Sequence, residues 1–129
     1  AGLQFLPPME VNLEPYLETE GVYGNYLKTV LAAELEYLCP APLDEEMIDE
    51  LNWLAAAVFR VTGALDFARI DFRLDKNDNF KPYILEINPL PGLMPKLSDI
   101  VIEANADGIS HTGLINMILN TALARYGMI

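Results

Sequence analysis

The chain has 129 residues, of which 52% are hydrophobic, and its formal net charge is -11 at pH 7. This length and hydrophobic content predict one domain with a core of its own. The negative charge argues against a nucleic-acid or anionic-membrane partner, because both are themselves negatively charged. An anionic nucleotide would need a metal ion between itself and this surface.

No apolar run approaches the length of a membrane span, and no signal peptide is visible. The single cysteine, Cys39, allows no intrachain disulfide, which is typical of a reducing compartment, so we expect a cytoplasmic protein. The single histidine, His111, has no second His or Cys as a metal partner. It is therefore expected to be an exposed or capping residue and not a ligand.

The first third of the sequence predicts little regular structure. Residues 5–12 favour a short strand, which Pro7 and Pro8 limit to a sheet edge. Residues 13–38 follow no single period, and the last part of this segment suits a helix or a strand.

Residues 44–62 form the clearest predicted helix. Asp44 is a good N-cap residue, and Gly63 ends the pattern. The apolar positions that recur at helical spacing are Met47, Ile48, Leu51, Leu54, Ala55, Val58 and Val61. This stripe is expected to face the core.

The strongest pattern lies in residues 66–98. Apolar and polar residues alternate in FARIDFRL (67–74) and again in YILEIN (83–88), which predicts an antiparallel hairpin. We expect Asp71 to lie opposite Glu86. The same register places Arg69 opposite Asn88 and Leu74 opposite Tyr83, and it leaves residues 75–82 as the connection, with Pro82 outside the ladder.

In this register Arg69, Asp71, Glu86 and Asn88 share one face of the hairpin. Carboxylate and amide oxygens are hard ligands that suit Mg²⁺, and an arginine can hold phosphate in a fork. The face therefore suits a metal nucleotide. A solvated face with an Arg–Asp pair is the alternative, because strand alternation of this kind is common.

A second metal interpretation concerns the connection. Asp75, Asn77, Asn79 and Glu86 fall at positions 1, 3, 5 and 12 of a calcium-loop pattern. Position 6 is Phe80, where that loop needs glycine, and the flanks have strand patterns. Ordinary turn chemistry explains DKNDN better, because Asn and Asp tolerate left-handed backbone.

The segment E-I-N-P-L-P-G (86–92), together with A-R-I-D-F (68–72), resembles the C-terminal part of ATP-grasp enzymes, and within them the D-alanine:D-alanine ligase group. Most ATP-grasp enzymes carry Arg after the Asn-Pro pair, whereas this chain has Leu90, Pro91 and Gly92, as that group does. The resemblance runs from about residues 6–8 to the end of the chain. Such a string of ordered motifs is specific, although each motif alone would be weak.

We therefore expect an α+β fold: an antiparallel sheet centred on the hairpin, with the two long helices packed on one face, forming a C-terminal ATP-grasp subdomain. Ser98 or Asp99 is expected to cap a short helix that ends at Gly108. Ser110 begins the last helix, and Arg125 lies in its last turn. The positions of this helix expected to face inward are Leu114, Ile115, Ile118, Leu119, Ala122 and Leu123.

The resemblance implies specific roles for the polar face. Asp71 would bind one Mg²⁺ (or Mn²⁺), Glu86 would bridge two, and Asn88 would complete the second. Arg69 would hold the transferring phosphate and the tetrahedral intermediate, and with Glu86 it would form the nucleotide-binding set. The backbone N–H of Gly92 would help to form the oxyanion site.

Three further residues are implied as substrate contacts. The family's serine for the substrate carboxylate usually lies five residues after the glycine, where this chain has Leu97; the nearest hydroxyl is Ser98. The family also closes a mobile loop with a Tyr and a Lys over the site. Tyr26 and Lys28 are the nearest candidates, and the alternative is a packed Tyr26 and a solvated Lys28.

The implied activity is an ATP-dependent ligase that joins two D-alanines through an acyl phosphate, in peptidoglycan precursor synthesis for the cell wall. Residues 1–129 would be the C-terminal portion of an ATP-grasp domain. The remaining N-terminal part of the ligase would supply the adenine hinge and the phosphate-binding lysine, so the chain alone is expected to be inactive. A homodimer is compatible with this resemblance. The alternatives are a ligase for other amino or carboxylic acids and a stand-alone, non-catalytic binding module.

Overall fold

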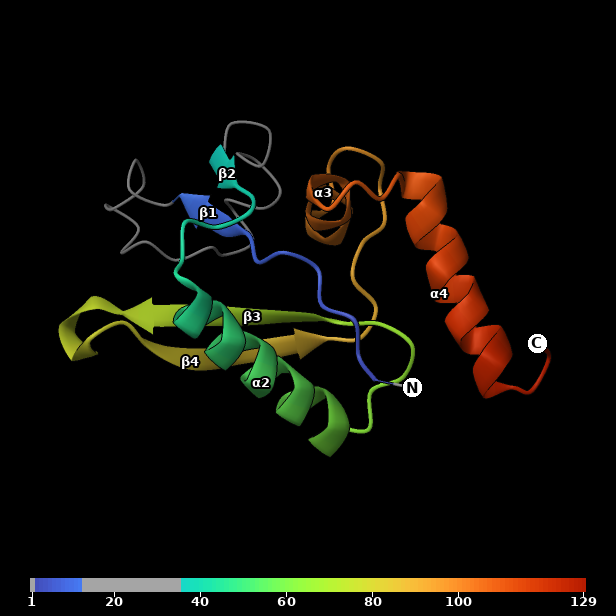
Figure 1. Cartoon of the computed structure of the whole chain (residues 1–129), viewed down its shortest axis with the longest axis horizontal. Coiled ribbons are helices and arrows are strands. Elements are labelled where there is room, and N and C mark those ends of the chain that lie inside the picture. The colour runs from blue at the N-terminus through green and yellow to red at the C-terminus, as the bar shows by residue number, and fades with distance from the viewer. Residues whose placement is uncertain (1, 13–35) are drawn as a thin grey trace.

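The computed structural model of the chain describes residues 2–12 and 36–129. Tyr26 and Lys28, the two loop candidates, lie outside this part of the chain. The regular elements are β1 (Glu10–Asn12), β2 (Glu36–Leu38), α2 (Glu45–Val61), β3 (Arg69–Asp75), the 3-10 helix η3 (Lys76–Asp78), β4 (Lys81–Asn88), α3 (Asp99–Ala106) and α4 (His111–Arg125). The fold is α+β, as predicted (Figure 1).

Two separate antiparallel sheets are present in this part of the chain, each with two strands. β1 pairs with β2, and of the strand predicted over residues 5–12 the structure has Glu10–Asn12 as strand. β3 pairs with β4 and forms the predicted hairpin. No helix in the described segments is both long and apolar enough to cross a bilayer.

Helix α2 begins and ends as predicted. The Asp44 carboxylate accepts a hydrogen bond from the backbone N–H of Met47 at 2.8 Å, which caps the helix. Gly63 follows the C-cap with φ of 70°, a conformation that glycine adopts at little cost. The helix lies along the β3–β4 hairpin (Figure 1), and Leu51 is its buried residue, whereas Val61 at the last turn is exposed.

Helices α3 and α4 pack on each other and form the centre of the core. Ser98 is the N-cap of α3, and the Ser110 hydroxyl caps α4 by accepting the N–H of Gly113 at 3.0 Å. The buried core residues are Ile100, Val101, Ala104 and Leu114, with Leu6, Phe67, Leu93, Ile109 and Ile118 packed against them. Only α2 of the two long helices lies over the hairpin, because the apolar side of α4 is used against α3 beyond the end of the strands (Figure 1). Leu119, expected to face inward, is 52% exposed.

The hairpin register is confirmed at the polar end and differs further along. Arg69 pairs with Asn88 and Asp71 with Glu86, as predicted. A bulge then shifts the register by one, so Tyr83 faces Arg73 and not Leu74. The extra residue is Leu85, and Ile84 takes the place opposite Phe72. A bulge reverses the alternation of side chains beyond it. The predicted facing of the β4 side chains is therefore correct only for residues 86–88, at the C-terminal end of the strand.

The bulge also shortens the connection. Pro82, expected outside the ladder, lies in β4 opposite Leu74. It fits there because alternate backbone N–H groups of an edge strand point away from the partner strand. The turn matches the predicted Asn and Asp chemistry: the Asp75 carboxylate accepts the N–H of Asn77 at 2.9 Å, and Asn79 has left-handed backbone with φ of 53°.

Candidate functional site

The polar face of the hairpin brings the predicted side chains together. Arg69 donates from Nε to Asp71 Oδ1 at 2.8 Å and from NH2 to Asp71 Oδ2 at 2.9 Å. The same NH2 group reaches Glu86 Oε1 at 3.4 Å. Hydrogen bonding to Asp71 is the main reason why the pKa of Arg69 is raised, so the guanidinium stays charged. Asn88 stands opposite Arg69, and its side-chain oxygen accepts the N–H of Leu90 at 3.1 Å.

A third carboxylate, from a different element, also contacts the arginine. Asp99, the first residue of α3, lies with Oδ2 at 3.5 Å from Arg69 NH1. Both side chains are mostly buried, at 14% exposed for Asp99 and 16% for Arg69. The sequence interpretation treated Asp99 only as a possible helix cap. The sequence signal for this contact is the position of Asp99, an acidic residue directly after the loop of residues 92–98.

Glu103 lies one helical turn after Asp99 and was also missed. Burial raises the pKa of Glu103 to about 8, the Asp99 carboxylate and Asp71 add to this shift, and the positive charge of Arg69 opposes it. The i, i+4 spacing of the two acidic residues places both on one face of α3. Glu103 therefore extends the acidic surroundings of Arg69 toward the interior.

The loop between β4 and α3 contains a hydrogen bond between two of its own residues. The Ser98 hydroxyl accepts the backbone N–H of Met94 at 2.8 Å. A Cβ atom at position 92 would lie 3.0 Å from that hydroxyl, so Gly92 allows a close approach that alanine would disturb. Ser98, predicted as a substrate contact, thus has a structural partner within its own loop.

His111 ties the same loop to the last helix. Its ring Nε2 lies 2.7 Å from the carbonyl oxygen of Leu93, and the ring is partly buried. Leu93 itself packs against the α3–α4 core. The expectation of an exposed or capping histidine is therefore replaced by that of a residue that anchors the loop after Gly92.

Burial also raises the pKa of the Cys39 thiol, which favours its neutral form.

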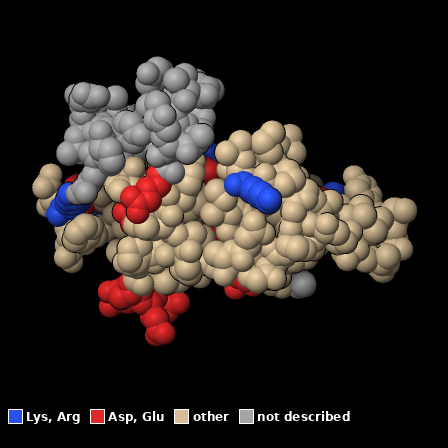
Figure 2. Space-filling model, turned by 90° about the horizontal axis from the view of Figure 1, so that it is seen from above, with Lys and Arg blue, Asp and Glu red and all other residues tan. Residues whose placement is uncertain are grey.

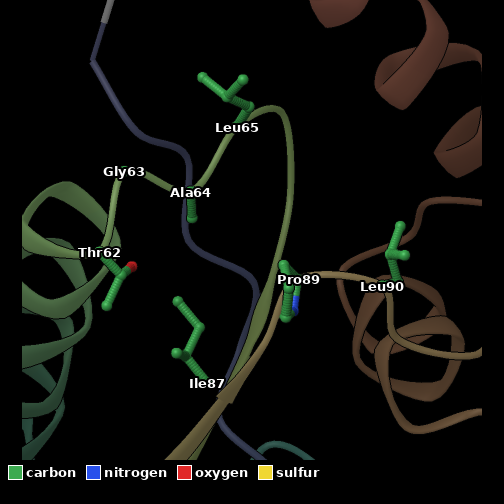
Figure 3. A pocket seen from close by; sticks show the side chains of 7 residues that line it. All are labelled: Thr62, Gly63, Ala64, Leu65, Ile87, Pro89 and Leu90. Carbon is green, nitrogen blue, oxygen red and sulfur yellow. The ribbon is translucent and has the colours of Figure 1, made fainter.

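An apolar hollow lies between the C-terminal end of β4 and the turn that follows α2. It has a volume of about 420 Å³ and is lined by Thr62, Gly63, Ala64, Leu65, Ile87, Pro89 and Leu90. Figure 3 shows the side chain of Ile87 pointing toward the turn that follows α2. Ile87 alternates along β4 with Glu86 and Asn88, so the hollow belongs to the opposite side of the strand.

Charge is distributed unevenly over the surface. Figure 2 shows a group of acidic side chains protruding from one edge of the molecule, while the Lys and Arg side chains in view lie elsewhere on the surface. Among residues 2–12 and 36–129, no three His, Cys, Asp or Glu side chains gather as a ligand set for a metal ion. The oxygens that suit Mg²⁺ best are those of Asp71, Glu86 and Asn88, two carboxylates and one amide on a single face.

Comparison with known proteins defines the class. Residues 9–120 match the family described as D-ala D-ala ligase C-terminus. A D-alanine–D-alanine ligase of Fervidobacterium nodosum is 39% identical over 106 residues, which cover 82% of this chain and 32% of the relative. The corresponding ligase of Herminiimonas arsenicoxydans is 34% identical over 110 residues, covering 84% and 32%.

An uncharacterised protein of Sinorhizobium fredii is 36% identical over 125 residues, which cover 91% of this chain and 36% of that protein. The chain spans about a third of the length of these curated relatives. The chain belongs to the D-alanine–D-alanine ligase C-terminal family, whose domain has the ATP-grasp fold.

Proposed function

We propose that this chain is the part of an ATP- and Mg²⁺-dependent ligase that holds the metal-bound phosphates. The whole enzyme would join two D-alanines through an acyl phosphate in peptidoglycan precursor synthesis. One observation carries the proposal: Arg69, Asp71, Glu86 and Asn88 share one face of the hairpin, at the end where the Gly92 loop begins. Membership of the D-alanine–D-alanine ligase family supports it.

The donor set fits Mg²⁺ or Mn²⁺. Asp71 and Glu86 stand opposite each other on neighbouring strands, and Asn88 follows Glu86 on the same face. In the proposed arrangement Asp71 would hold one ion, Glu86 would contact both, and Asn88 would complete the second. Metal ions bound there would neutralise phosphate charge and align the nucleotide.

The protein's own groups would stabilise the charge that develops during transfer. Arg69 stays protonated and offers a planar fork that suits phosphate oxygens. The Gly92 N–H would donate to the tetrahedral intermediate, and Leu93 fixes the loop by packing into the core. Ser98, Tyr26 and Lys28 are proposed to contact the amino-acid substrates.

One observation favours a second candidate, a ligase for other amino or carboxylic acids. Ser98 stands six residues after Gly92, one more than the family spacing, and its hydroxyl already accepts the N–H of Met94. A changed carboxylate contact would suit a different second substrate.

The test is a ligation assay with the full-length protein that carries this domain. ATP, Mg²⁺ and D-alanine should yield ADP and a dipeptide detected by mass spectrometry, while L-alanine should not. Dipeptides formed only with other acids in a panel would support the second candidate. Nucleotide binding without ADP formation for any acid would contradict both and indicate a binding module.

A further inference from the structure

Asp99 connects the polar face to the helical core. Its Oδ2 lies 3.5 Å from Arg69 NH1, although the two residues belong to α3 and β3. The contact is mostly buried, so water screens it less than it screens an exposed pair. Asp99 is thus an off-hairpin partner of the arginine, whose other ion pairs within residues 2–12 and 36–129 are with Asp71 of β3 and Glu86 of β4.

Asp99 contacts a different nitrogen of Arg69 from those that Asp71 and Glu86 contact. Asp71 takes Nε and NH2, Glu86 shares NH2, and Asp99 takes NH1. Asp71 and Glu86 are also the proposed metal ligands, and an oxygen that coordinates a cation is a weaker acceptor for a guanidinium. Asp99 can keep its hold on the arginine while the other two carboxylates turn to a metal.

The position of Asp99 is well suited to a fixed anchor. The next two residues, Ile100 and Val101, are buried in the core at 6% and 0% exposed. A carboxylate in the first turn of a helix is also favoured by the helix dipole. The α3 backbone therefore holds this side chain in place independently of the hairpin.

We propose that Asp99 is a positioning residue that keeps Arg69 aimed at the transferring phosphate when Asp71 and Glu86 bind metal. This inference rests on the proposed function of the same face. It predicts two effects of losing the Asp99 charge. Arg69 becomes less well oriented for phosphoryl transfer. Its guanidinium also interacts more strongly with the Asp71 and Glu86 carboxylates, so it competes better with a metal ion for their oxygens.

The test compares three variants of the full-length protein. Asp99→Asn keeps the shape and removes the charge, whereas Asp99→Glu keeps the charge on a longer side chain. Asp107→Asn removes an exposed charge from the C-cap of the same helix and is the matched control. Two quantities are measured: Mn²⁺ affinity without nucleotide, by electron paramagnetic resonance titration, and kcat for ligation.

Asp99→Asn should lower kcat by about 10- to 100-fold, the range seen when residues supporting a metal site are changed. Its Mn²⁺ dissociation constant should rise several-fold, and Asp99→Glu should restore much of both values. Asp107→Asn should match the wild type. If Asp99→Asn fails to fold, Asp99→Ser, which suits a helix N-terminus, replaces it.

The inference would be overturned if a folded Asp99→Asn protein had the kcat and the Mn²⁺ affinity of the wild type, even if its thermal stability were lower. A wild-type protein that joins no D-alanine would contradict the proposed function instead. The Mn²⁺ titration would still judge Asp99 in that case, because it needs no turnover.

Discussion

Asp71 lies directly opposite Glu86 on neighbouring strands, and the Arg69 guanidinium bridges the two carboxylates with contacts of 2.8, 2.9 and 3.4 Å. Two negative charges held this close repel each other, and one arginine offsets this only in part. A divalent cation would relieve the remaining repulsion. This pair is therefore the natural place to test the proposed site.

The first prediction concerns Glu86, which alone is proposed to touch both ions. Glu86→Gln keeps the shape and removes the charge, so ligation by the full-length protein should fall by roughly 100-fold or more, since metal ions supply several kcal/mol of charge stabilisation. Asp71→Asn should act similarly but less severely. Activity titrated against Mg²⁺ measures both effects.

Asp75→Asn is the control, because its side chain serves the turn and Asn can still accept the N–H of Asn77. It should leave activity and metal dependence unchanged. Near-normal activity and Mg²⁺ dependence in Glu86→Gln would show that the proposed mechanism is wrong.

The second prediction concerns the close approach in the loop. Gly92→Ala places a Cβ 3.0 Å from Ser98 Oγ and should displace the hydroxyl from Met94 N–H, at a cost of about 1 kcal/mol in the free energy of unfolding. The fall in kcat should be larger than this loss of stability alone explains, because the Gly92 N–H is proposed to face the reacting centre. Urea unfolding and kcat measure the two effects.

Gly2→Ala is the matched control, because a Cβ there would meet nothing within 4 Å. Removing the obstructing hydroxyl in Gly92→Ala/Ser98→Ala should reduce the added effect of the Gly92 change. The steric explanation fails if Gly92→Ala has the same effect whether position 98 is Ser or Ala.

The third prediction is a pH dependence of stability. Burial raises the pKa of Glu103 from 4.5 to about 8, so the folded state binds a proton more tightly than the unfolded state does. The free energy of unfolding should therefore fall as the pH rises from about 4.5 to about 8. Glu103→Gln removes this contribution and should stabilise the metal-free protein by about 1–3 kcal/mol at pH 8.

Urea unfolding at several pH values checks this, with the exposed Glu50→Gln as the control for a lost charge. An unchanged slope of stability against pH in Glu103→Gln would show that Glu103 does not cause the dependence.

The fourth prediction concerns the ion pair between Asp66 and Arg125. Arg125 donates from Nε and NH2 to both carboxylate oxygens, at 3.0 and 2.9 Å, and so joins the end of α4 to the segment before β3. These bonds lower the pKa of Asp66 below its usual value of 3.8. Their contribution to stability is present above that usual value and is lost as the pH falls through the lower value in the folded protein.

Asp66→Asn should lower the melting temperature slightly at pH 7, and the difference from the wild type should shrink in acid. Asn tolerates the positive φ of 69° at this position, so the variant tests charge and not backbone strain. A difference that persists unchanged at the lowest pH would point to another cause.

The sequence alone determined the elements whose signals are local. Asp44 and Ser110 cap helices where they were expected, because a cap depends on a side chain and an N–H a few residues away. The register at Arg69–Asn88 and Asp71–Glu86 could also be predicted, because shifting it by one residue would expose the apolar face.

Only the tertiary structure decided the rest. The bulge at Leu85 depends on how two whole strands pair, and strand alternation cannot reveal an extra residue. The contact between Asp99 and Arg69 and the burial of Glu103 require α3 to be packed beside the hairpin. Side chains 30 residues apart become neighbours only when the core of Val101, Ala104 and Leu114 is assembled, because burial in that core sets where α3 lies.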